Sequence, residues 1–214
     1  MKGLLSFEGP VIQFFHKTGE VIIATMLFLL FCVPVVTAGA SATSLYYSII
    51  KSVRRERGYV TSEFMRSLKR TLGKGVILTV GMLIWFGVLI LGRMHSGGHM
   101  ALAYSALIAV SVCVSVYIFP VLSRFDMKLA GIIKLSFVMS IRYIYYTVPI
   151  IAGTVLLAWL QYFYLPMPCI LLLPGAWCYA VTFMMERALL GYMPAKEEAE
   201  KNDQGGVTDT WYYE

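Results

Sequence analysis

The chain alternates between long apolar runs and shorter segments rich in basic residues, and this alternation predicts a helical membrane protein. The longest run, residues 21–50, holds thirty residues without a charged side chain. Thirty helical residues rise about 45 Å, whereas the hydrocarbon core of a bilayer is roughly 30 Å thick. We therefore expect this run to enter the bilayer, bend and continue.

The expected bend lies at Pro34, because proline lacks a backbone N–H and clashes with the carbonyl one turn earlier. Gly39 follows in a stretch of small residues, which allows another backbone to approach closely. From residue 42 to residue 55 the apolar positions follow helical spacing, with Ser44 and Ser48 among the polar positions opposite. This pattern predicts an amphipathic helix that either lies in the membrane interface or forms a short span.

The first span is expected over residues 21–36, after a short interfacial segment over residues 3–16. Four more apolar runs predict spans over residues 75–91, 100–119, 143–164 and 169–185. The predicted fold is an all-α polytopic membrane bundle of five spans, or of six if residues 39–56 also cross. Five spans place the N-terminus outside the cell, and six place it inside.

Two basic segments set the predicted orientation. Residues 51–74 hold eight basic and two acidic side chains, and residues 124–142 hold four basic and one acidic. By the positive-inside rule both segments face the cytoplasm. The apolar positions of residues 129–141 recur at helical intervals, which predicts a second amphipathic helix along the inner leaflet.

Composition supports one membrane domain followed by a tail. Of the 214 residues 58% are hydrophobic and 14% charged, where a soluble domain has about 25% charged residues. Residues 1–193 form the predicted membrane domain and carry 16 basic and 6 acidic side chains. Residues 194–214 carry 2 basic and 6 acidic ones and are expected to form a disordered acidic tail in the cytoplasm. The expected location is a cell membrane, crossed several times.

No pattern in the chain indicates catalysis. Motifs for a serine hydrolase, a zinc protease or a nucleotide site are absent from the sequence. His95 and His99 lie four residues apart, but two glycines between them disfavour a helix and two imidazoles leave a zinc site incomplete. We therefore expect no enzyme activity, cofactor, metal or nucleic-acid partner.

Ionisable residues are missing from the middle of every predicted span. Arg124, Asp126 and Glu186 lie at span ends, where we expect their side chains to reach the membrane surface. A transporter coupled to protons or ions would need charged groups within the bilayer. This distribution therefore disfavours coupled transport, although a path for a neutral solute stays open.

Two segments carry a resemblance to a known family. The run Cys32-Val-Pro-Val-Val-Thr-Ala-Gly-Ala-Ser-Ala-Thr43, followed by two tyrosines and a basic stretch, resembles the signature of the YesL-like family of bacterial integral membrane proteins, whose function is unassigned. The run Phe119-Pro-Val-Leu-Ser-Arg-Phe-Asp126 is similar to a second motif of that family. The family often has Asn in the first span where this chain has Ala24-Thr25. The resemblance implies structural roles for Pro34, Thr37, Gly39, Pro120, Arg124 and Asp126.

The resemblance also implies a function, because such proteins tend to be encoded beside carbohydrate uptake systems. The expected role is a non-enzymatic accessory subunit of an ATP-driven sugar importer, with the membrane subunits of that importer and the lipid bilayer as partners. The alternative is an autonomous permease for a small neutral solute such as a sugar. Within the basic segment, apolar anchors rimmed by cations suggest a docking face for a partner, formed by Phe64, Arg66, Leu68, Lys69 and Arg70.

Overall fold

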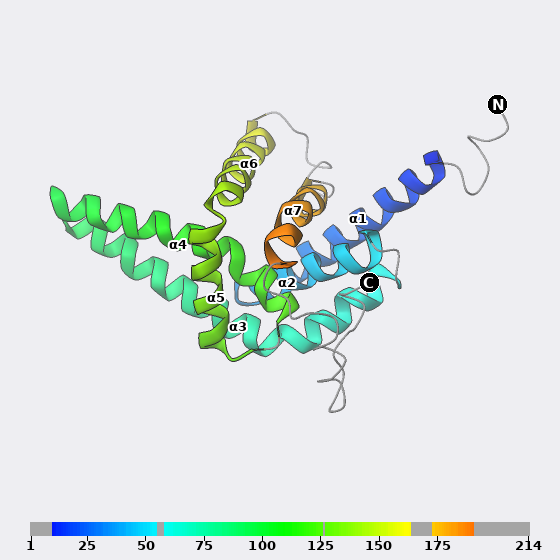
Figure 1. Cartoon of the computed structure of the whole chain (residues 1–214), viewed down its shortest axis with the longest axis horizontal. Helices are drawn as coiled ribbons and strands as arrows, with labels where there is room; N and C mark the ends of the chain where they lie inside the picture. The colour runs from blue at the N-terminus through cyan, green and yellow to red at the C-terminus, as the bar shows by residue number, and fades with distance from the viewer. Residues whose placement is uncertain (1–9, 55–57, 126, 164–172, 191–214) are drawn as a thin grey trace.

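The computed structural model describes residues 10–54, 58–125, 127–163 and 173–190. All secondary structure in this part of the chain is helical, which confirms the predicted all-α class. Asp126 and the predicted tail over residues 194–214 lie outside the described residues. The elements, shown in Figure 1, are α1 (Pro10–Cys32), the 3-10 turn η1 (Val35–Thr37), α2 (Ala38–Ser48), the π-helix η2 (Ile49–Arg54), α3 (Val60–His95), α4 (His99–Arg124), α5 (Leu129–Arg142), α6 (Ile144–Phe163) and α7 (Leu173–Leu190).

Helix α1 ends at Cys32, and the chain reverses direction at Pro34. Val21 and Ala24 of α1 pack with Leu45 and Ile49, so α2 runs antiparallel to α1 in a helical hairpin. Residues 10–16 belong to α1, so the separate interfacial segment expected over residues 3–16 is wrong for its described part. The chain breaks at the proline because proline cannot donate to the preceding turn of helix.

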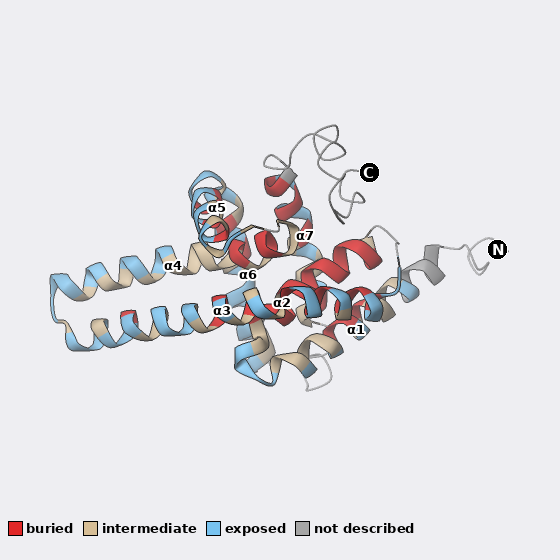
Figure 2. Ribbon diagram, turned by 90° about the horizontal axis from the view of Figure 1, so that it is seen from below, coloured by how far each residue is buried: buried red, intermediate tan, exposed pale blue. Residues whose placement is uncertain are grey.

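Helix α2 lies at the centre of the protein and contacts α1, α3, α4 and α7. From Gly39 to Val53 every residue except Ala42 is buried (Figure 2). The predicted helix is present as α2 and η2, but Ser44 and Ser48 are buried together with the apolar positions, so its described part has no separate polar face. Its hydroxyls stay dry because they bond to the helix backbone: Ser44 donates to the Ala40 carbonyl at 2.8 Å, and Ser48 to the Leu45 carbonyl at 3.1 Å.

Helix α3 is continuous over 36 residues, so the basic residues 60–74 begin the same helix as the expected span over residues 75–91. It pairs with α4 in a hairpin that projects away from the core (Figures 1 and 2). The indole N–H of Trp85 donates to the hydroxyl of Ser111 at 3.0 Å across this hairpin. Helix α4 continues past Pro120 to Arg124, so the helix extends beyond the expected span over residues 100–119.

Three helices of the described chain are long and apolar enough to cross a membrane: α3, α4 and α6. They indicate a membrane protein in contact with the lipid bilayer. Between α5 and α6 only Tyr143 is not helical. The hydroxyl of Tyr117 ties α4 to this junction, because it lies 2.8 Å from the Thr147 hydroxyl and donates to the Tyr143 carbonyl at 3.1 Å.

Candidate functional site

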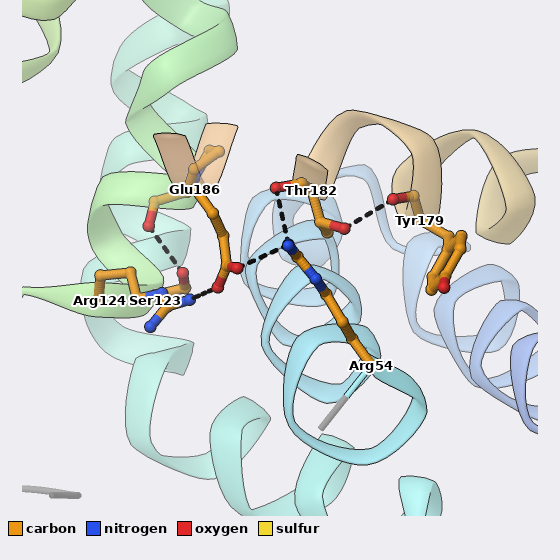
Figure 3. Close-up of polar contacts among 7 residues, drawn as sticks. Arg54, Ser123, Arg124, Tyr179, Thr182 and Glu186 are labelled. Carbon is orange, nitrogen blue, oxygen red and sulfur yellow. Dashed lines mark hydrogen bonds and ion pairs between the residues drawn. The ribbon is translucent and has the colours of Figure 1, made fainter. Parts of the chain in front are cut away.

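Glu186 forms the centre of a buried ion cluster, where α7 meets η2 and the end of α4 (Figure 3). One carboxylate oxygen, Oε2, lies 2.6 Å from Nη1 of Arg54. The other, Oε1, accepts a hydrogen bond from Nη2 of Arg124. The side chain of Arg124 is only 3% exposed and that of Glu186 10%, whereas that of Arg54 is 27% exposed. One carboxylate therefore holds together three segments far apart in the sequence.

Arg54 has further contacts with α7. Its Nη1 donates to the backbone carbonyl of Thr182 at 3.3 Å, and its guanidinium carbon lies 4.3 Å from the centre of the Phe183 ring. Arginine favours such sites because its planar cation can bond at the edge and stack on a ring at the same time. The last turn of η2 is thus fixed to α7 by charge, by a hydrogen bond and by stacking.

A second buried ion pair joins η2 to α3. The Lys51 ammonium lies 2.9 Å from Oε2 of Glu63, and both side chains are 10% exposed. The same ammonium donates to the Tyr47 hydroxyl at 3.3 Å and lies 5.5 Å from the centre of that ring. The π-helix thus directs its two cations to different neighbours, Lys51 to α3 and Arg54 to α7. Short π-helices often occur at functional sites, where the wider turn re-aims side chains.

The charged side chains of these ion pairs are largely buried, which restricts them to a structural role unless their partners change. An unpaired charge in the protein interior costs several kcal/mol, so a buried ion must keep its partners. The expectation that Arg124 and Glu186 reach the membrane surface is therefore wrong, because these two side chains pair with each other inside the bundle. The cluster is suited to holding helices in register. Beside it the buried Tyr46 hydroxyl, on which the charges of Arg124 and Glu186 act, has no hydrogen-bond partner among the described residues.

The residues of the first motif lie at the α1–α2 turn. The Thr37 hydroxyl donates to the carbonyls of Phe31 at 2.6 Å and of Pro34 at 2.9 Å. A Cβ added at Gly39 would lie 2.0 Å from the Thr79 hydroxyl oxygen and 2.5 Å from the Phe119 ring. These residues therefore sit where the hairpin meets α3 and α4.

Of the second motif, Pro120 is buried within α4 and Arg124 joins the ion cluster. The partners of Arg124 were missed by sequence reasoning. The sequence shows that Glu186 and Arg54 each lie near the end of an apolar run. The residues around each of them do not indicate that the two side chains pair. A pair of opposite charges that each border an apolar run is the signal that could have raised the possibility.

The predicted docking face is divided by the fold. Phe64 and Leu68 are 0% and 2% exposed and belong to the core that packs α3 against α1 and α2, so they cannot serve as exposed anchors. Arg66, Lys69 and Arg70 are exposed on the opposite side of α3. Helical spacing identified the apolar stripe of this segment, but the stripe faces the protein's own core. Partner binding by the three cations stays a prediction.

The two histidines lie on different helices, since His95 ends α3 and His99 begins α4. Among the described residues no group of three or more His, Cys, Asp or Glu side chains could hold a metal ion.

Residues 21–93 match the model of a family described as "Protein of unknown function, DUF624". The matched region starts in α1 and ends near the end of α3, so it contains the hairpin, η2 and Arg54. It excludes Arg124 and Glu186, the two partners that complete the ion cluster. No curated protein and no solved structure matches the chain.

Proposed function

We propose that the protein is a non-enzymatic integral membrane subunit that assists an ATP-driven carbohydrate importer in the bacterial cell membrane, with its C-terminus in the cytoplasm. The sugar importer enters through the sequence resemblance to the YesL-like family. The observation that supports an accessory role is the projecting α3–α4 hairpin, because the rest of the chain leaves most of its apolar surface uncovered.

The hairpin exposes apolar side chains on both of its helices. In the most apolar 18-residue stretches of α3 and α4 only 22% and 28% of the residues are buried. The exposed side chains include Ile84, Trp85, Val88, Leu91, Met94, Met100, Leu102 and Leu107. A single helical pair that extends from a packed core offers a long surface for the helices of another membrane subunit, with lipid covering the rest.

The ion cluster supports a structural role for the charged residues. Glu186 is engaged by two arginines, and Glu63 is engaged by Lys51 and lies 3.8 Å from Arg66. Ionisable residues within a membrane pair with one another or with backbone carbonyls, and they often mark ion pathways or proton relays. Carboxylates held by two cations each are better suited to fixing helices in one arrangement.

The alternative is an autonomous permease for a small neutral solute such as a sugar. One observation favours it: the hydroxyls of Tyr46, Ser52 and Ser136 are buried without a hydrogen-bond partner among the described residues. Such groups could bond to a solute hydroxyl. We rank this function second because these hydroxyls lie on three different elements, α2, η2 and α5.

Copurification from the native membrane separates the two functions. The tagged protein should bring importer subunits in fixed stoichiometry, and Ile84→Ala with Leu91→Ala should reduce their recovery. The matched control is Val155→Ala with Leu156→Ala on α6, where the exposed fractions are similar: 64% and 59%, against 64% and 61%. Recovery of no stoichiometric partner, together with sugar uptake by the purified protein in liposomes, would favour the permease.

A further inference from the structure

The turn of the α1–α2 hairpin is an exposed apolar tip. Val33, Val35 and Val36 are 78%, 60% and 44% exposed. The outer side of α1 continues this surface with Ile23, Met26 and Leu30. Charged residues border the hairpin only at its base, at Glu20 on α1 and at Lys51 on η2. An apolar tip and stripe above a charged base are typical of a segment that contacts lipid.

The uncharged part of each arm of the hairpin is too short to cross a bilayer. The uncharged part of α1, residues 21–32, rises about 18 Å, and the uncharged part of the returning arm, residues 38–50, rises about 20 Å. A hydrocarbon core of roughly 30 Å needs about 20 helical residues. The two arms nevertheless match each other in length, as expected if they enter and leave through the same surface.

The backbone of the turn is prepared for an apolar environment. Irregular backbone within a membrane is costly unless its polar groups find partners inside the protein. Pro34 has no N–H to satisfy, and the Thr37 N–H donates to the Pro34 carbonyl at 2.9 Å. The Thr37 hydroxyl donates to the carbonyls of Phe31 and Pro34. Thr37 thus provides hydrogen bonds for three groups that a helix break would leave without partners: the carbonyls of Phe31 and Pro34 and its own N–H.

Contacts with α3 fix the depth of the hairpin. Near the tip, Ala40 lies so close to α3 that a Cβ added at Gly75 would be 2.9 Å from its Cα. At the base, Lys51 pairs with Glu63. Helix α3 carries its basic residues before Gly75 and no charge from there until Arg93. The hairpin therefore lies beside the charged half of α3, and its tip points toward the half that enters the bilayer.

We infer that α1 and α2 form a re-entrant hairpin, which inserts its tip into one leaflet and crosses no membrane, so that the start of α1 lies on the same side as the basic residues of α3. The occupant of the apolar tip is lipid. The hairpin removes one span from the predicted count of five and two from the predicted count of six, so both counts become four. The four crossings are α3, α4 and α6 together with the predicted span over residues 169–185, of which α7 forms the described part. The start of α1 and the end of α7 then both lie on the basic, cytoplasmic side.

Thiol accessibility in intact cells and inverted vesicles tests this topology. Single cysteines would be placed at His16 and Val35 after alanine replacement of the four native cysteines, with Lys69→Cys and His95→Cys as references for the two sides. An impermeant reagent should label His16→Cys only from the side of Lys69→Cys. It should label Val35→Cys from neither side, whereas a membrane-permeant reagent should label it.

Each other pattern overturns the inference in a distinct way. Labelling of His16→Cys from the side of His95→Cys means that α1 spans the bilayer. Labelling of Val35→Cys by the impermeant reagent from the side of His95→Cys means that α1 and α2 both span the bilayer. Labelling of Val35→Cys by the impermeant reagent from the side of Lys69→Cys means that the tip lies in water or on another protein. Variants that fail to give a single folded species in detergent would be replaced by cysteines at Val33 or Val36, which have the same predicted patterns.

Discussion

Glu186→Ala, which removes the central carboxylate of the ion cluster, should destabilise the protein more than Arg54→Ala does. Glu186→Ala leaves Arg54 and Arg124 without their shared anion, and the side chain of Arg124 is only 3% exposed. Breaking a buried ion pair by removing one partner costs about 3 to 5 kcal/mol, because the other charge is left uncompensated. We therefore expect Glu186→Ala to lower the free energy of unfolding by about that amount.

Arg54→Ala should cost less. Its side chain is 27% exposed, and after its removal Glu186 keeps its bond to Arg124. The losses are one partly screened ion pair, the hydrogen bond to the Thr182 carbonyl and the stacking on Phe183, for which we expect about 2 kcal/mol together. We therefore expect the free energy of unfolding of Glu186→Ala to be well below that of Arg54→Ala. Glu186→Ala leaves the buried Arg124 without this carboxylate, whereas Arg54→Ala leaves Glu186 paired with Arg124.

Unfolding of the purified protein by denaturing detergent in mixed micelles, followed by circular dichroism, measures this difference. Arg187→Ala is the matched control, because Arg187 is the next residue on α7 and is exposed; its effect should stay within about 0.5 kcal/mol. Replacement of both buried partners, Arg124→Met with Glu186→Leu, should recover part of the loss, since no buried charge is then left between them. Equal effects of Glu186→Ala and Arg187→Ala would refute the reasoning.

Three further changes test the packing. Gly75→Ala should lower the free energy of unfolding by about 1 to 3 kcal/mol, because its Cβ would meet the backbone of Ala40. Gly73→Ala, whose Cβ would have no atom within 4 Å, should raise the free energy of unfolding by up to about 1 kcal/mol. Thermal unfolding of both variants measures the difference. Thr37→Val should reduce the folded yield measured by size-exclusion chromatography, and Thr37→Ser should restore it, because only the hydroxyl is needed. Tyr117→Phe should cost about 1 to 2 kcal/mol in the detergent unfolding assay, because it loses both bonds to the α5–α6 junction.

The local parts of the fold could be predicted from the sequence. Apolar runs bounded by charges identified α3, α4 and α6, because hydrophobic length and helical spacing are properties of a single segment. The break near Pro34 could be located for the same reason, since its cause is covalent. The charges of residues 51–74 predict a segment separate from the span over residues 75–91, but no proline interrupts the chain between residues 60 and 91, and α3 runs through both.

The non-local parts could not be predicted. The hydroxyls of Ser44 and Ser48 suggested a face in water, but hydroxyls can bond to their own helix and then be buried at little cost. Phe64 and Leu68 form an apolar stripe whose spacing carries no information on whether it meets a partner or the chain's own core. Glu186 and Arg54 find each other only because α7 returns beside η2, which is a property of the whole topology.

The matched segment, residues 21–93, does not complete its own core in this chain. Tyr46, Tyr47 and Ile50 on its central arm pack with residues of α4, α5 and α7, including Tyr117 and Met185. Its Arg54 depends on Glu186, which lies outside the segment. In a chain that contained only the matched segment, the rings of Tyr46 and Tyr47 would lose these contacts, and the partly buried guanidinium of Arg54 would lose its carboxylate partner. The segment therefore needs either the rest of this chain or a partner with an equivalent acid. Glu186 on α7 supplies that acid here, and through Arg54 and Arg124 it joins η2, at the base of the hairpin, to the end of α4.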